Sequence, residues 1–562
     1  MSDAPKPELE RIKEESRYLR GSIKEELSND ESNFARDTTQ ILKFHGAYQQ
    51  DDRDVRTARR KEGKPPLFSV MVRSKIPGGR MSAEQYLVHD QLSEQFSGAA
   101  LRVTTRQGLQ FHGVLKKNVK AVIHGINEKL GTTLGACGDN VRNVMACPAP
   151  SVDRVKLNVY EYAKAVSDQF LARTRAYHEI WLNGEPVKDF ESAGSDVEPI
   201  YGKSYLPRKF KFALAFPEDN CVDVYTHDVG MIPDVDGSRL KGFNILVGGG
   251  LGMSHGAKDT FPRLADPFCF IVPDELADLT KAIVSVQRDY GDRTSRKHAR
   301  MKYLIHDRGL EWFRAEVRKR YGKELPPPRA ISWKGCDVHL GWHEQGDGRW
   351  YFGVSVENGR IRNEGSYRLK SGLREIVKRF QIPVHLTAAQ DVLLCNLRTE
   401  QKKELEGLLK TYGIKEPGTL SNIQTYSMAC PALPTCGLAI TESERALPSL
   451  IDELEAALKN LGLEKETITT RMTGCPNGCA RPYSSEIGLV GRKVGTYNIY
   501  LGGSFDGTRL NQVFAEDVPQ KAVAGKLISV FKLFKERRKP GERFGDFCHR
   551  LGIQHVQTLV GM

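Results

Sequence analysis

Long hydrophobic runs are missing from this sequence of 562 residues. No stretch approaches the roughly 18 consecutive apolar residues that a membrane-spanning helix needs. The N-terminus, MSDAPKPELERIKEE, has no apolar core, so it does not have the pattern of a signal peptide. We therefore expect a cytoplasmic protein that does not associate with membranes.

Disulfide-like cysteine spacing is also missing. The chain has 11 cysteines, an odd number, spread from Cys137 to Cys548. Small secreted domains have cysteines at the regular spacing of a disulfide framework, and the cysteines of this chain do not have such spacing. A reducing compartment with free thiols is the better interpretation.

A dinucleotide-binding motif is a third absence. The segment VGGGLG at 247–252 follows a predicted strand, but it lacks the G-x-G-x-x-G spacing and no clean helix follows it. No other segment suggests a flavin or NADPH site.

Positive charge is present in excess, with a formal net charge of +13. Nucleic acid is a common partner of basic proteins. Here the basic residues are dispersed, and their densest run is the short FKERRKPGER at 534–543. A polyanionic cofactor with an anionic substrate would explain the charge equally well, so composition leaves both classes of function open.

An internal repeat organises the chain. The segment LRVTTRQGLQFHGVL (101–115) aligns with VHLTAAQDVLLCNL (384–397), and MACPAP (145–150) aligns with MACPAL (428–433). Thr104 aligns with Thr387 and Gln107 with Gln390, all at an offset of 283. One offset shared by separate segments indicates a duplicated unit, folded with pseudo-two-fold symmetry. Alternating strand-like and helix-like segments predict an α+β fold.

The two copies differ at several aligned positions, where the first copy has polar or basic residues and the second has small or apolar ones or threonine. Alternate positions of a strand share one face, so we expect three polar residues of the first copy to line an anion site together. Surface salt bridges are the alternative. The polar residues of copy one and their aligned partners in copy two are Arg106 with Ala389, Gln110 with Leu393, His112 with Cys395, and Arg142 with Thr425.

Four cysteines in the second copy form two closely spaced pairs. Cys430 and Cys436 are a C-x5-C pair, and Cys475 and Cys479 in TGCPNGC are a C-x3-C pair. Four thiolates suit either zinc or an iron–sulfur cluster, but structural zinc sites favour gaps of two to four residues. Prolines and glycines beside both pairs would let the backbone approach cluster sulfides. A [4Fe–4S] cluster is favoured over zinc and over unligated thiols.

With these cysteines the chain resembles the sulfite and nitrite reductase family, which couples siroheme to a [4Fe–4S] cluster. The resemblance includes IPGG, RQGLQFHG, RNVMACP, YLPRKFK and FNILVGGGLG. It implies an internally duplicated fold of ferredoxin-like half-domains and two larger α/β domains that bind siroheme and the cluster. The implied division is an arm at 1–65, half-domains at 66–136 and 331–415, and larger domains at 137–330 and 416–562.

The resemblance also implies the roles of individual residues. Cys430, Cys436, Cys475 and Cys479 would bind the cluster, with Cys479 shared with the siroheme iron. Arg73 and Arg142 would anchor sulfite, and Lys209 and Lys211 would deliver protons, because lysine pKa values fall beside other cations. The implied siroheme-binding residues are Arg102, Arg106, Gln110, His112, Arg208, Arg300 and Asn477. Gly138 departs from the pattern of a hemoprotein in this family, which has an asparagine of the siroheme pocket there, so water would have to replace that polar contact.

The arm refines the expected partner. Its segments SRYLRGSIKEEL and KFHGAYQQDDRDVR resemble the hemoprotein subunit of NADPH-dependent assimilatory sulfite reductases, which implies a flavoprotein partner that docks on the arm. Its high charge predicts little contribution to the core, and an arm that wraps the core and stabilises it is the alternative. A ferredoxin-dependent sulfite or nitrite reductase is the alternative, although Lys211, where nitrite reductases have asparagine, favours sulfite. A zinc-stabilised nucleic-acid-binding protein is the remote alternative.

Overall fold

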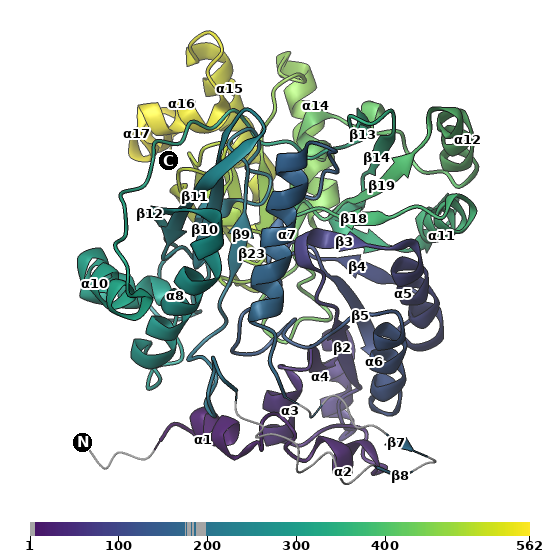
Figure 1. Ribbon diagram of the computed structural model, residues 1–562. Helices are drawn as coiled ribbons and strands as arrows, with labels where there is room; N and C mark the ends of the chain where they lie inside the picture. Colours follow the sequence, from purple (N-terminus) through teal and green to yellow (C-terminus); the bar gives the residue numbers. More distant parts are fainter. Residues whose placement is uncertain (1–5, 175, 177–180, 183–184, 187–197, 562) are drawn as a thin grey trace.

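The computed structural model describes residues 6–174, 176, 181–182, 185–186 and 198–561. Helices and sheets alternate through the chain, as the predicted α+β class requires (Figure 1). Four five-stranded sheets form two equivalent pairs, one pair in each copy of the repeat. The duplication inferred from the offset of 283 is therefore present in the three-dimensional structure.

The two smaller sheets have the same strand order. The first runs β1-β2-β5-β4-β15 and the second β13-β14-β19-β18-β3. Their outer faces carry helices α5 and α6 in the first copy, and α11 and α12 in the second (Figure 1). The strands of the first are β1 (Ala47–Asp51), β2 (Phe68–Arg73), β5 (Leu109–Val114), β4 (Leu101–Val103) and β15 (Arg360–Ile361). Those of the second are β13 (Gly341–Glu344), β14 (Trp350–Val354), β19 (Val392–Leu397), β18 (Val384–Leu386) and β3 (Arg80–Met81).

Each small sheet is completed by a strand from the other copy. β15, from the second copy, pairs with β4 through Arg360 and Arg102. β3, from the first copy, pairs with β18 through Arg80 and His385. The two sheets consequently share one continuous hydrophobic core, which includes Leu101 and Phe111 of one copy and Leu394 of the other.

The two larger sheets also match strand for strand. Their orders are β12-β11-β10-β9-β6 and β20-β21-β22-β23-β24. In both, the first two pairings along the chain are parallel and the next two are antiparallel. The strands are β6 (Met145–Ala146), β9 (Phe212–Leu214), β10 (Val229–Asp236), β11 (Arg239–Val247), β12 (Asp266–Ile271), β20 (Ser427–Ala429), β21 (Thr470–Thr473), β22 (Ile487–Lys493), β23 (Thr496–Leu501) and β24 (Gln512–Pro519).

The helices follow the same duplication. α6 and α12 begin 283 residues apart, as do the strands β5 and β19. The main helices are α5 (Ala83–Phe96), α6 (Val119–Glu128), α7 (Arg154–Gln169), α8 (Leu276–Tyr290), α9 (Met301–Arg308), α10 (Leu310–Tyr321), α11 (Leu369–Phe380), α12 (Lys402–Thr411), α14 (Leu447–Leu461), α15 (Gln520–Arg537), α16 (Phe544–Leu551) and α17 (Ile553–Leu559).

The N-terminal segment contributes more to the core than its composition predicts. It forms α1 (Glu8–Glu15), α2 (Ile23–Leu27), α3 (Arg36–Leu42), β1 and α4 (Arg53–Lys61), while residues 1–5 lie outside the described residues. β1 pairs along its whole length with β2. Phe34, Ile41 and Phe44 are each 2% exposed and belong to the two largest cores. The expectation of little core contribution is therefore wrong: a few apolar side chains among many charged ones are enough to anchor the segment.

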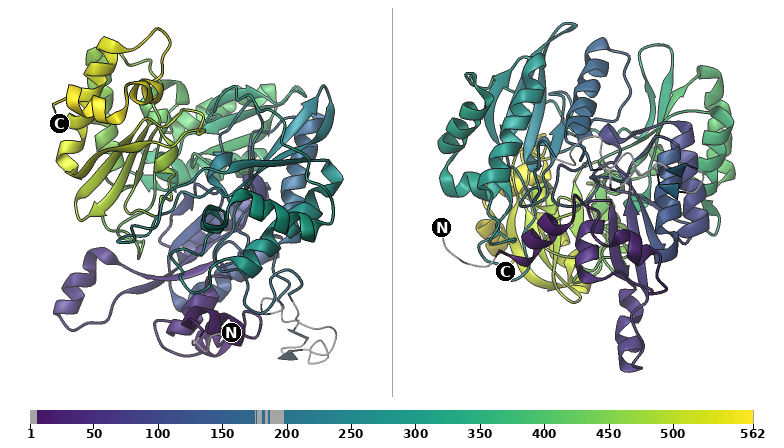
Figure 2. Two further views of the ribbon diagram at one scale, coloured as in Figure 1. Left: turned by 90° about the vertical axis from the view of Figure 1, so that its left-hand side faces the viewer. Right: turned by 60° about the horizontal axis from the view of Figure 1, so that its bottom comes forward.

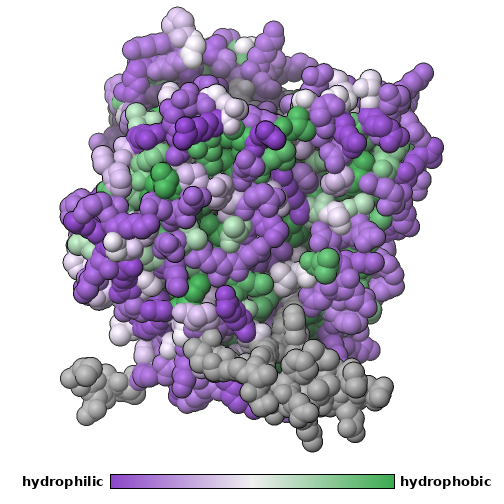
Figure 3. All heavy atoms as spheres, in the orientation of Figure 1, coloured by the Kyte–Doolittle hydropathy of each residue, from purple (hydrophilic) through white to green (hydrophobic). Residues whose placement is uncertain are grey.

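Helix α4 is the part of this segment that projects from the body of the molecule (Figure 2). The face in Figure 3 is mostly hydrophilic, with apolar side chains in small groups. None of the helices that the structure describes is long and apolar enough to cross a membrane.

Candidate active site

The strand pattern of the second copy explains why the four cysteines converge. Cys430 directly follows β20, and Cys475 and Cys479 lie in the loop after β21. These strands are parallel neighbours, so their carboxyl ends meet at one edge of the sheet. Cys436 comes from the loop after Cys430, where its backbone N–H donates to the carbonyl oxygen of Ala432 at 2.8 Å. Two pairs 38 or more residues apart thus reach one place.

The four sulfurs share an electrostatic environment. Cys430 and Cys475 are buried, Cys436 is half-buried and Cys479 is exposed. Burial, followed by the neighbouring Cys479, raises the pKa of Cys475 to about 11. Burial and then Cys479 also raise the pKa values of Cys430 and Cys436. Thiols that hinder each other's ionisation in this way become stable as thiolates only when a cation is bound between them.

Hydrogen-bond donors point at these sulfurs. The backbone N–H of Gly474 donates to Cys430 Sγ at 3.4 Å, and the amide of Asn477 donates to Cys475 Sγ at 3.4 Å. A Cβ on Gly474 would lie 2.4 Å from the carbonyl oxygen of Thr441, so the backbone can approach this closely only with glycine. The glycine beside the cysteines lets the backbone approach the sulfur, as expected from the sequence, whereas the contact of Asn477 with Cys475 differs from its expected role at siroheme, which stays a prediction.

The spacing of the sulfurs distinguishes a cluster from one metal ion. Tetrahedral zinc binds sulfur at about 2.3 Å, which places two thiolates about 3.8 Å apart. In the described part of the chain, the one group of three or more possible ligand atoms within 4.8 Å of one another is formed by other residues. The four cysteines do not form such a group, so they are not gathered at the spacing that one zinc ion needs.

The predicted anion-binding residues lie on elements of the first copy. Arg73 ends β2 and donates from Nη1 to Cys137 Sγ at 3.0 Å. Arg142 is buried and donates from Nε to the carbonyl oxygen of Gly138 at 2.7 Å. Its backbone N–H donates to the carbonyl oxygen of Phe210 at 2.8 Å, and so aligns the segment that carries Lys209 and Lys211 beside Arg142.

The two lysines are half-buried cations without partners. Neither ammonium group has a hydrogen bond or an ion pair within the residues that the structure describes. Burial, followed by the charge of Arg208, lowers the pKa of Lys209 to about 7. Burial, then Arg106 and Lys209, holds the pKa of Lys211 well below its ordinary value. An anion between them would relieve this repulsion.

Charge interactions connect these cations to the cysteines of the other copy. Cys479 partly opposes the lowering of the pKa of Lys209 by burial and Arg208, and after Cys137 and Tyr48 it contributes to the raised pKa of Arg73. The exposed end of the cysteine loop therefore faces the basic residues. Thr105 of the first copy donates from Oγ1 to the carbonyl oxygen of Cys479 at 2.8 Å. The candidate site is therefore formed between the two copies, with cations from one and thiolates from the other.

The expected strand face of Arg106, Gln110 and His112 is only partly correct. Gln110 and His112 lie on β5 and approach each other at 3.4 Å. Arg106 lies in the preceding turn, where Gln107 has a φ of +53°. It donates instead to Nδ1 of His227 at 3.0 Å. Even spacing in the sequence did not place Arg106 on the strand, because β5 begins only at Leu109.

Some of the predicted siroheme-binding cations already pair with protein groups. Arg102 is 1% exposed, forms an ion pair with Glu444, and donates to the carbonyl oxygen of Ala429 at 3.0 Å. Since Ala429 precedes Cys430, this bond holds the cysteine strand against the first copy. Arg300 pairs with Asp228 at 2.8 Å. Arg208 lies 4.0 Å from Asp139 and is half-buried.

Gly138 has a structural reason to be glycine. Its φ is +87°, and a Cβ would lie 2.8 Å from the ring of Phe44. The ring of Phe44, from the N-terminal segment, thus occupies the space that a side chain at position 138 would need.

Sequence reasoning missed several charged residues of the site. Lys302 donates to the carbonyl oxygens of Gly250 and Gly252 at 3.1 and 2.9 Å, and burial with the charge of Arg300 lowers its pKa to about 6. Arg481, two residues after Cys479, forms a buried ion pair with Asp223. The glycine-rich VGGGLG loop was the available signal for Lys302, because its exposed carbonyl oxygens need a cationic donor.

Comparison with known proteins agrees with this arrangement. The family described as "Nitrite and sulphite reductase 4Fe-4S domain" matches residues 137–325 and 427–562. The family described as "Nitrite/Sulfite reductase ferredoxin-like half domain" matches residues 63–129 and 343–412. Each family thus matches once in either copy of the repeat, which confirms the resemblance and the fold class stated above.

Individual relatives cover nearly the whole chain. "Sulfite reductase [NADPH] hemoprotein beta-component" of Geobacillus kaustophilus is 45% identical over 98% of this chain and 96% of its own length. "Sulfite reductase [ferredoxin]" of Synechococcus elongatus is also 45% identical, over 98% of this chain and 90% of its own. The structure of the Mycobacterium tuberculosis NirA protein has a TM-score of 0.79, with 23% identity and 98% coverage of both chains. That structure supports the fold alone.

Proposed function

The chain belongs to the nitrite and sulfite reductase family, and from this premise we propose that it reduces sulfite to sulfide as the hemoprotein subunit of an NADPH-dependent assimilatory sulfite reductase. Siroheme and a [4Fe–4S] cluster are its cofactors, as the matched family and the relatives named as hemoproteins imply. When bound, they supply the iron centre and the stored electrons. Cys430, Cys436, Cys475 and Cys479 would hold the cluster, and Cys479 would also reach the siroheme iron.

The observation that carries this proposal is the unpartnered pair Lys209 and Lys211 beside Arg142 and Cys479. Burying a doubly charged anion without cations would cost several kcal/mol, so a site for sulfite needs such a cluster. Half-buried cations without carboxylate partners also cost free energy, because they lose hydration without gaining an opposite charge. A substrate that carries up to two negative charges would gain the cations that it needs and would also neutralise the unpartnered lysines.

The two kinds of cation have different roles. Arginine stays protonated at physiological pH and donates paired hydrogen bonds, so Arg73 and Arg142 would orient the sulfite oxygens. Removal of three oxygens as water consumes protons together with the six electrons. A lysine whose pKa is about 7 gives up a proton readily near neutral pH, and Lys209 has that value. Lys211 would act with it, and water would return the protons.

The basic residues of the first copy would hold the eight siroheme carboxylates. Burial lowers the pKa values of Arg106, Arg208 and Lys302, and the nearby charge of Arg300 contributes to the lowering in all three. Gln110, His112 and Asn477 would add hydrogen bonds. Arg102 and Arg300 would bind siroheme carboxylates while keeping their ion pairs with Glu444 and Asp228.

We further propose the division of the chain into an arm (1–65), half-domains (66–136 and 331–415) and larger domains (137–330 and 416–562). The ranges matched by the two families support it. Because β1 pairs with β2, the arm and the first half-domain pack as one unit. The free thiols fit a cytoplasmic location.

The N-terminal segment would dock the electron donor. The backbone N–H of Arg53 donates to the carbonyl oxygen of Pro434 at 3.2 Å, and its guanidinium donates to that of Cys436 at 3.2 Å. Helix α4 therefore begins on the cysteine loop and projects outward with Arg60 and Lys61 exposed. A partner held on α4 would lie close to the cluster. A flavoprotein and a ferredoxin are the two candidate donors, since relatives of both kinds are equally similar.

The test measures sulfite turnover by the purified holoenzyme with each donor. We expect turnover with NADPH and the sulfite reductase flavoprotein to exceed turnover with reduced ferredoxin, and sulfite to be preferred to nitrite. Higher turnover with ferredoxin would overturn the NADPH assignment, and a preference for nitrite would overturn the substrate assignment. A small chemical reductant serves as the control for a working active site.

A further inference from the structure

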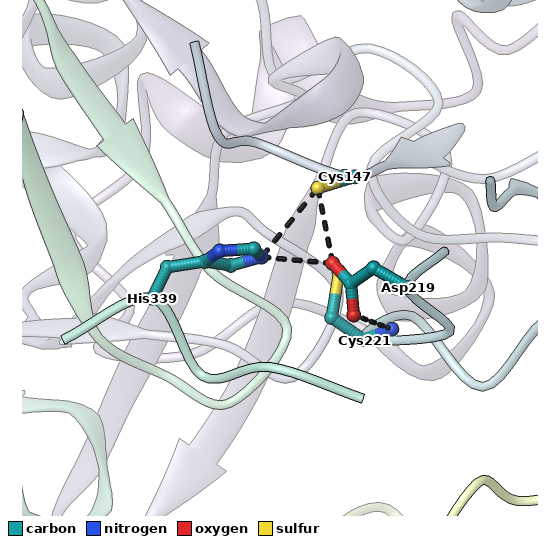
Figure 4. A group of neighbouring side chains, drawn as sticks. All are labelled: Cys147, Asp219, Cys221 and His339. Atoms are coloured by element: carbon teal, nitrogen blue, oxygen red, sulfur yellow. Dashed lines mark hydrogen bonds and ion pairs between the residues drawn. The ribbon is translucent and has the colours of Figure 1, made fainter. Parts of the chain in front are cut away.

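Four potential metal ligands converge away from the cysteine pairs of the active site. They are Cys147, Asp219, Cys221 and His339, whose ligand atoms all lie within 4.8 Å of one another (Figure 4). His339 is buried and the other three are half-buried. The sulfur of Cys147 lies 3.4 Å from Asp219 Oδ2 and 3.5 Å from His339 Nε2. The distance from His339 Nε2 to Asp219 Oδ2 is 2.9 Å.

The four residues come from three separate segments. Cys147 directly follows β6, and Asp219 and Cys221 lie in the loop after β9. His339 lies in the segment between α10 and β13, which crosses from the first copy of the repeat to the second. That crossover, 322–340, has no helix or strand of its own. The cluster is one of several contacts that hold the crossover against the first copy, together with the hydrogen bonds of Arg329 to Asn244 and of Trp333 to Tyr225.

Backbone hydrogen bonds orient Asp219 toward the centre of the cluster. Its Oδ1 accepts from the backbone N–H groups of Cys221 and Asp337 at 3.0 and 2.9 Å. Its other oxygen, Oδ2, is left to face Cys147 and His339. On the far side of the imidazole, Asp337 Oδ2 lies 3.7 Å from His339 Nδ1. A carboxylate behind a metal-binding histidine fixes the ring and makes it a better ligand.

The geometry is not that of a nucleophilic triad. In a Cys–His–Asp triad the thiol meets one ring nitrogen and the carboxylate meets the other. Here a second carboxylate, that of Asp219, approaches the same nitrogen as Cys147, Nε2 of His339. On the Nδ1 side Asp337 lies at 3.7 Å, which is beyond hydrogen-bond distance. Three ligand atoms that point at one another have a common centre, which is the arrangement that a bound cation requires.

We propose that Cys147, Asp219, Cys221 and His339 bind one Zn²⁺ ion in a tetrahedral structural site. Zinc accepts thiolate, imidazole and carboxylate ligands at about 2.0–2.3 Å, which sets ligand atoms about 3.3–3.8 Å apart. The observed separations of 2.9–3.5 Å need little adjustment. Calcium and magnesium prefer oxygen ligands only, so two sulfurs and a nitrogen select a softer ion.

The structure also provides a route for the ion. A cavity of about 310 Å³ is lined by Cys147, Asp219 and His339, together with Lys156 and Tyr351. An entry path of this kind lets a folded chain load its metal. All four protein ligands are present, so no position remains open for a reacting water, and the site is structural rather than catalytic.

The proposed site is linked to the active site through one loop. Asp223, four residues after Asp219, accepts from Arg471 at 2.7 Å and also pairs with Arg481, next to the cysteine loop. Zinc would therefore fix one end of the loop whose other end holds Arg481. This inference concerns a site separate from the proposed sulfite chemistry and does not depend on it.

The test is metal analysis of the full-length holoenzyme, purified without chelators from zinc-supplemented cells. We expect about one zinc per chain in addition to the iron of the cofactors. In Cys221→Ser and His339→Asn, zinc should fall to about a tenth or less while the iron content stays unchanged. X-ray absorption at the zinc edge, which siroheme does not obscure, should show two sulfur and two nitrogen or oxygen ligands.

Matched variants control for non-specific loss. Glu218→Gln and His343→Asn change neighbours of the same chemical type outside the four ligands, and both should retain zinc. His343 contacts the carbonyl oxygen of Leu340 and stacks on Tyr351 instead. Wild-type protein without zinc, or Cys221→Ser and His339→Asn proteins with full zinc, would overturn the proposal.

A second measurement covers the case in which a ligand variant fails to fold. Lys334 lies in the crossover with 70% of its side chain exposed, so trypsin can reach it. Treating the wild-type holoenzyme with a zinc-selective chelator should speed cleavage after Lys334 at least several-fold, and added zinc ions should reverse the effect. An unchanged cleavage rate in protein that has lost its zinc would contradict the proposed structural role.

Discussion

Gln107 donates a hydrogen bond to the carbonyl oxygen of Leu386, 279 residues away in the second copy, at 3.0 Å. Gln390, the equivalent residue of the second copy, reaches back to the carbonyl oxygen of Val103 at 3.4 Å. Gln107 and Gln390 both have positive φ angles, +53° and +77°. The two hydrogen bonds are related by the pseudo-two-fold symmetry and cross between the copies at their centre.

The first prediction concerns this crossing. Gln107→Ala should lower the free energy of unfolding by about 1–3 kcal/mol, because it leaves buried carbonyl groups of Leu386 and Ala146 without donors. Gln554→Ala, at an exposed position of α17, should change it by less than about 0.5 kcal/mol. Denaturant titration followed by circular dichroism measures both. Equal effects of the two substitutions would contradict a special role for the crossing.

The second prediction concerns the cluster. Cys430→Ser, Cys436→Ser and Cys475→Ser should each remove most of the non-siroheme iron and the acid-labile sulfide, since a hydroxyl is too hard a ligand to replace a thiolate. Cys269→Ser, a buried cysteine on β12, is the matched control and should retain both. Iron and sulfide analysis of the purified proteins checks this. Full iron in the three variants would refute the ligand assignment.

The third prediction concerns substrate charge. Lys211→Asn should lower kcat/KM for sulfite by about ten-fold or more, and that for nitrite much less, because nitrite carries one charge and needs fewer cations. Arg142→Ala should raise KM for sulfite and also lower kcat. Steady-state rates with both substrates and a small chemical reductant are the measurement. Equal losses for sulfite and nitrite in Lys211→Asn would exclude the charge argument.

The fourth prediction concerns pH. The pKa of Lys209 is lowered to about 7, so its proton-donating form is lost as the pH rises through about 7. Sulfite turnover should therefore fall on the alkaline side of neutrality. In Lys209→Arg, whose guanidinium stays protonated, that decline should shift upward and the maximal rate should be lower. The ionisation of sulfite itself is common to both proteins, so the difference between their profiles isolates Lys209. Superimposable profiles would rule it out as the proton donor.

The fifth prediction concerns the donor surface. Arg60→Glu combined with Lys61→Glu should slow turnover through the protein donor several-fold, by like-charge repulsion with an acidic partner surface. Turnover with a small chemical reductant should not change. Lys535→Glu combined with Arg537→Glu reverses two exposed charges on α15, at the opposite end of the molecule in Figure 1, and should have little effect. A loss with both donors would indicate damage to the fold.

Deleting the N-terminal segment would be a poorer test of the same idea. Such a deletion removes β1 and the ring of Phe44, which fills the space beside Gly138. We expect the shortened chain to lose stability as well as donor binding. Charge reversal on the exposed end of α4 separates the two effects.

The sequence predicted the duplication and the fold class correctly, because a repeat at one offset is a local pattern. The four cysteine ligands and the basic residues that face them stay predictions. Thr104 and Thr387 keep one offset, and Cys430 follows a strand that the repeat itself identifies. The exchange of strands between the copies, in which β15 joins the sheet of the first copy and β3 that of the second, could not be predicted in this way. β3 and β15 are two residues long, too short to show any periodicity.

Other features depended on contacts between distant segments. Phe34 and Phe44 are anchors within a segment whose average composition is polar, so composition concealed them. The turn at Gln107, with its positive φ, moved Arg106 off the predicted strand face. Cys147 and His339 are 192 residues apart and belong to no spacing motif, so only the folded chain brings them together.

The exchange of β3 and β15 also determines how the chain could be divided. Severing the polypeptide within 322–340 would leave each fragment with one bare sheet edge, at β4 in one and β18 in the other. Bare edges recruit foreign strands, and such fragments would tend to aggregate. Covalent continuity instead keeps each missing strand at the high effective concentration of an intramolecular partner. Complementation between co-expressed fragments is therefore the way to obtain this fold from two polypeptides, and neither fragment would be a stable protein alone.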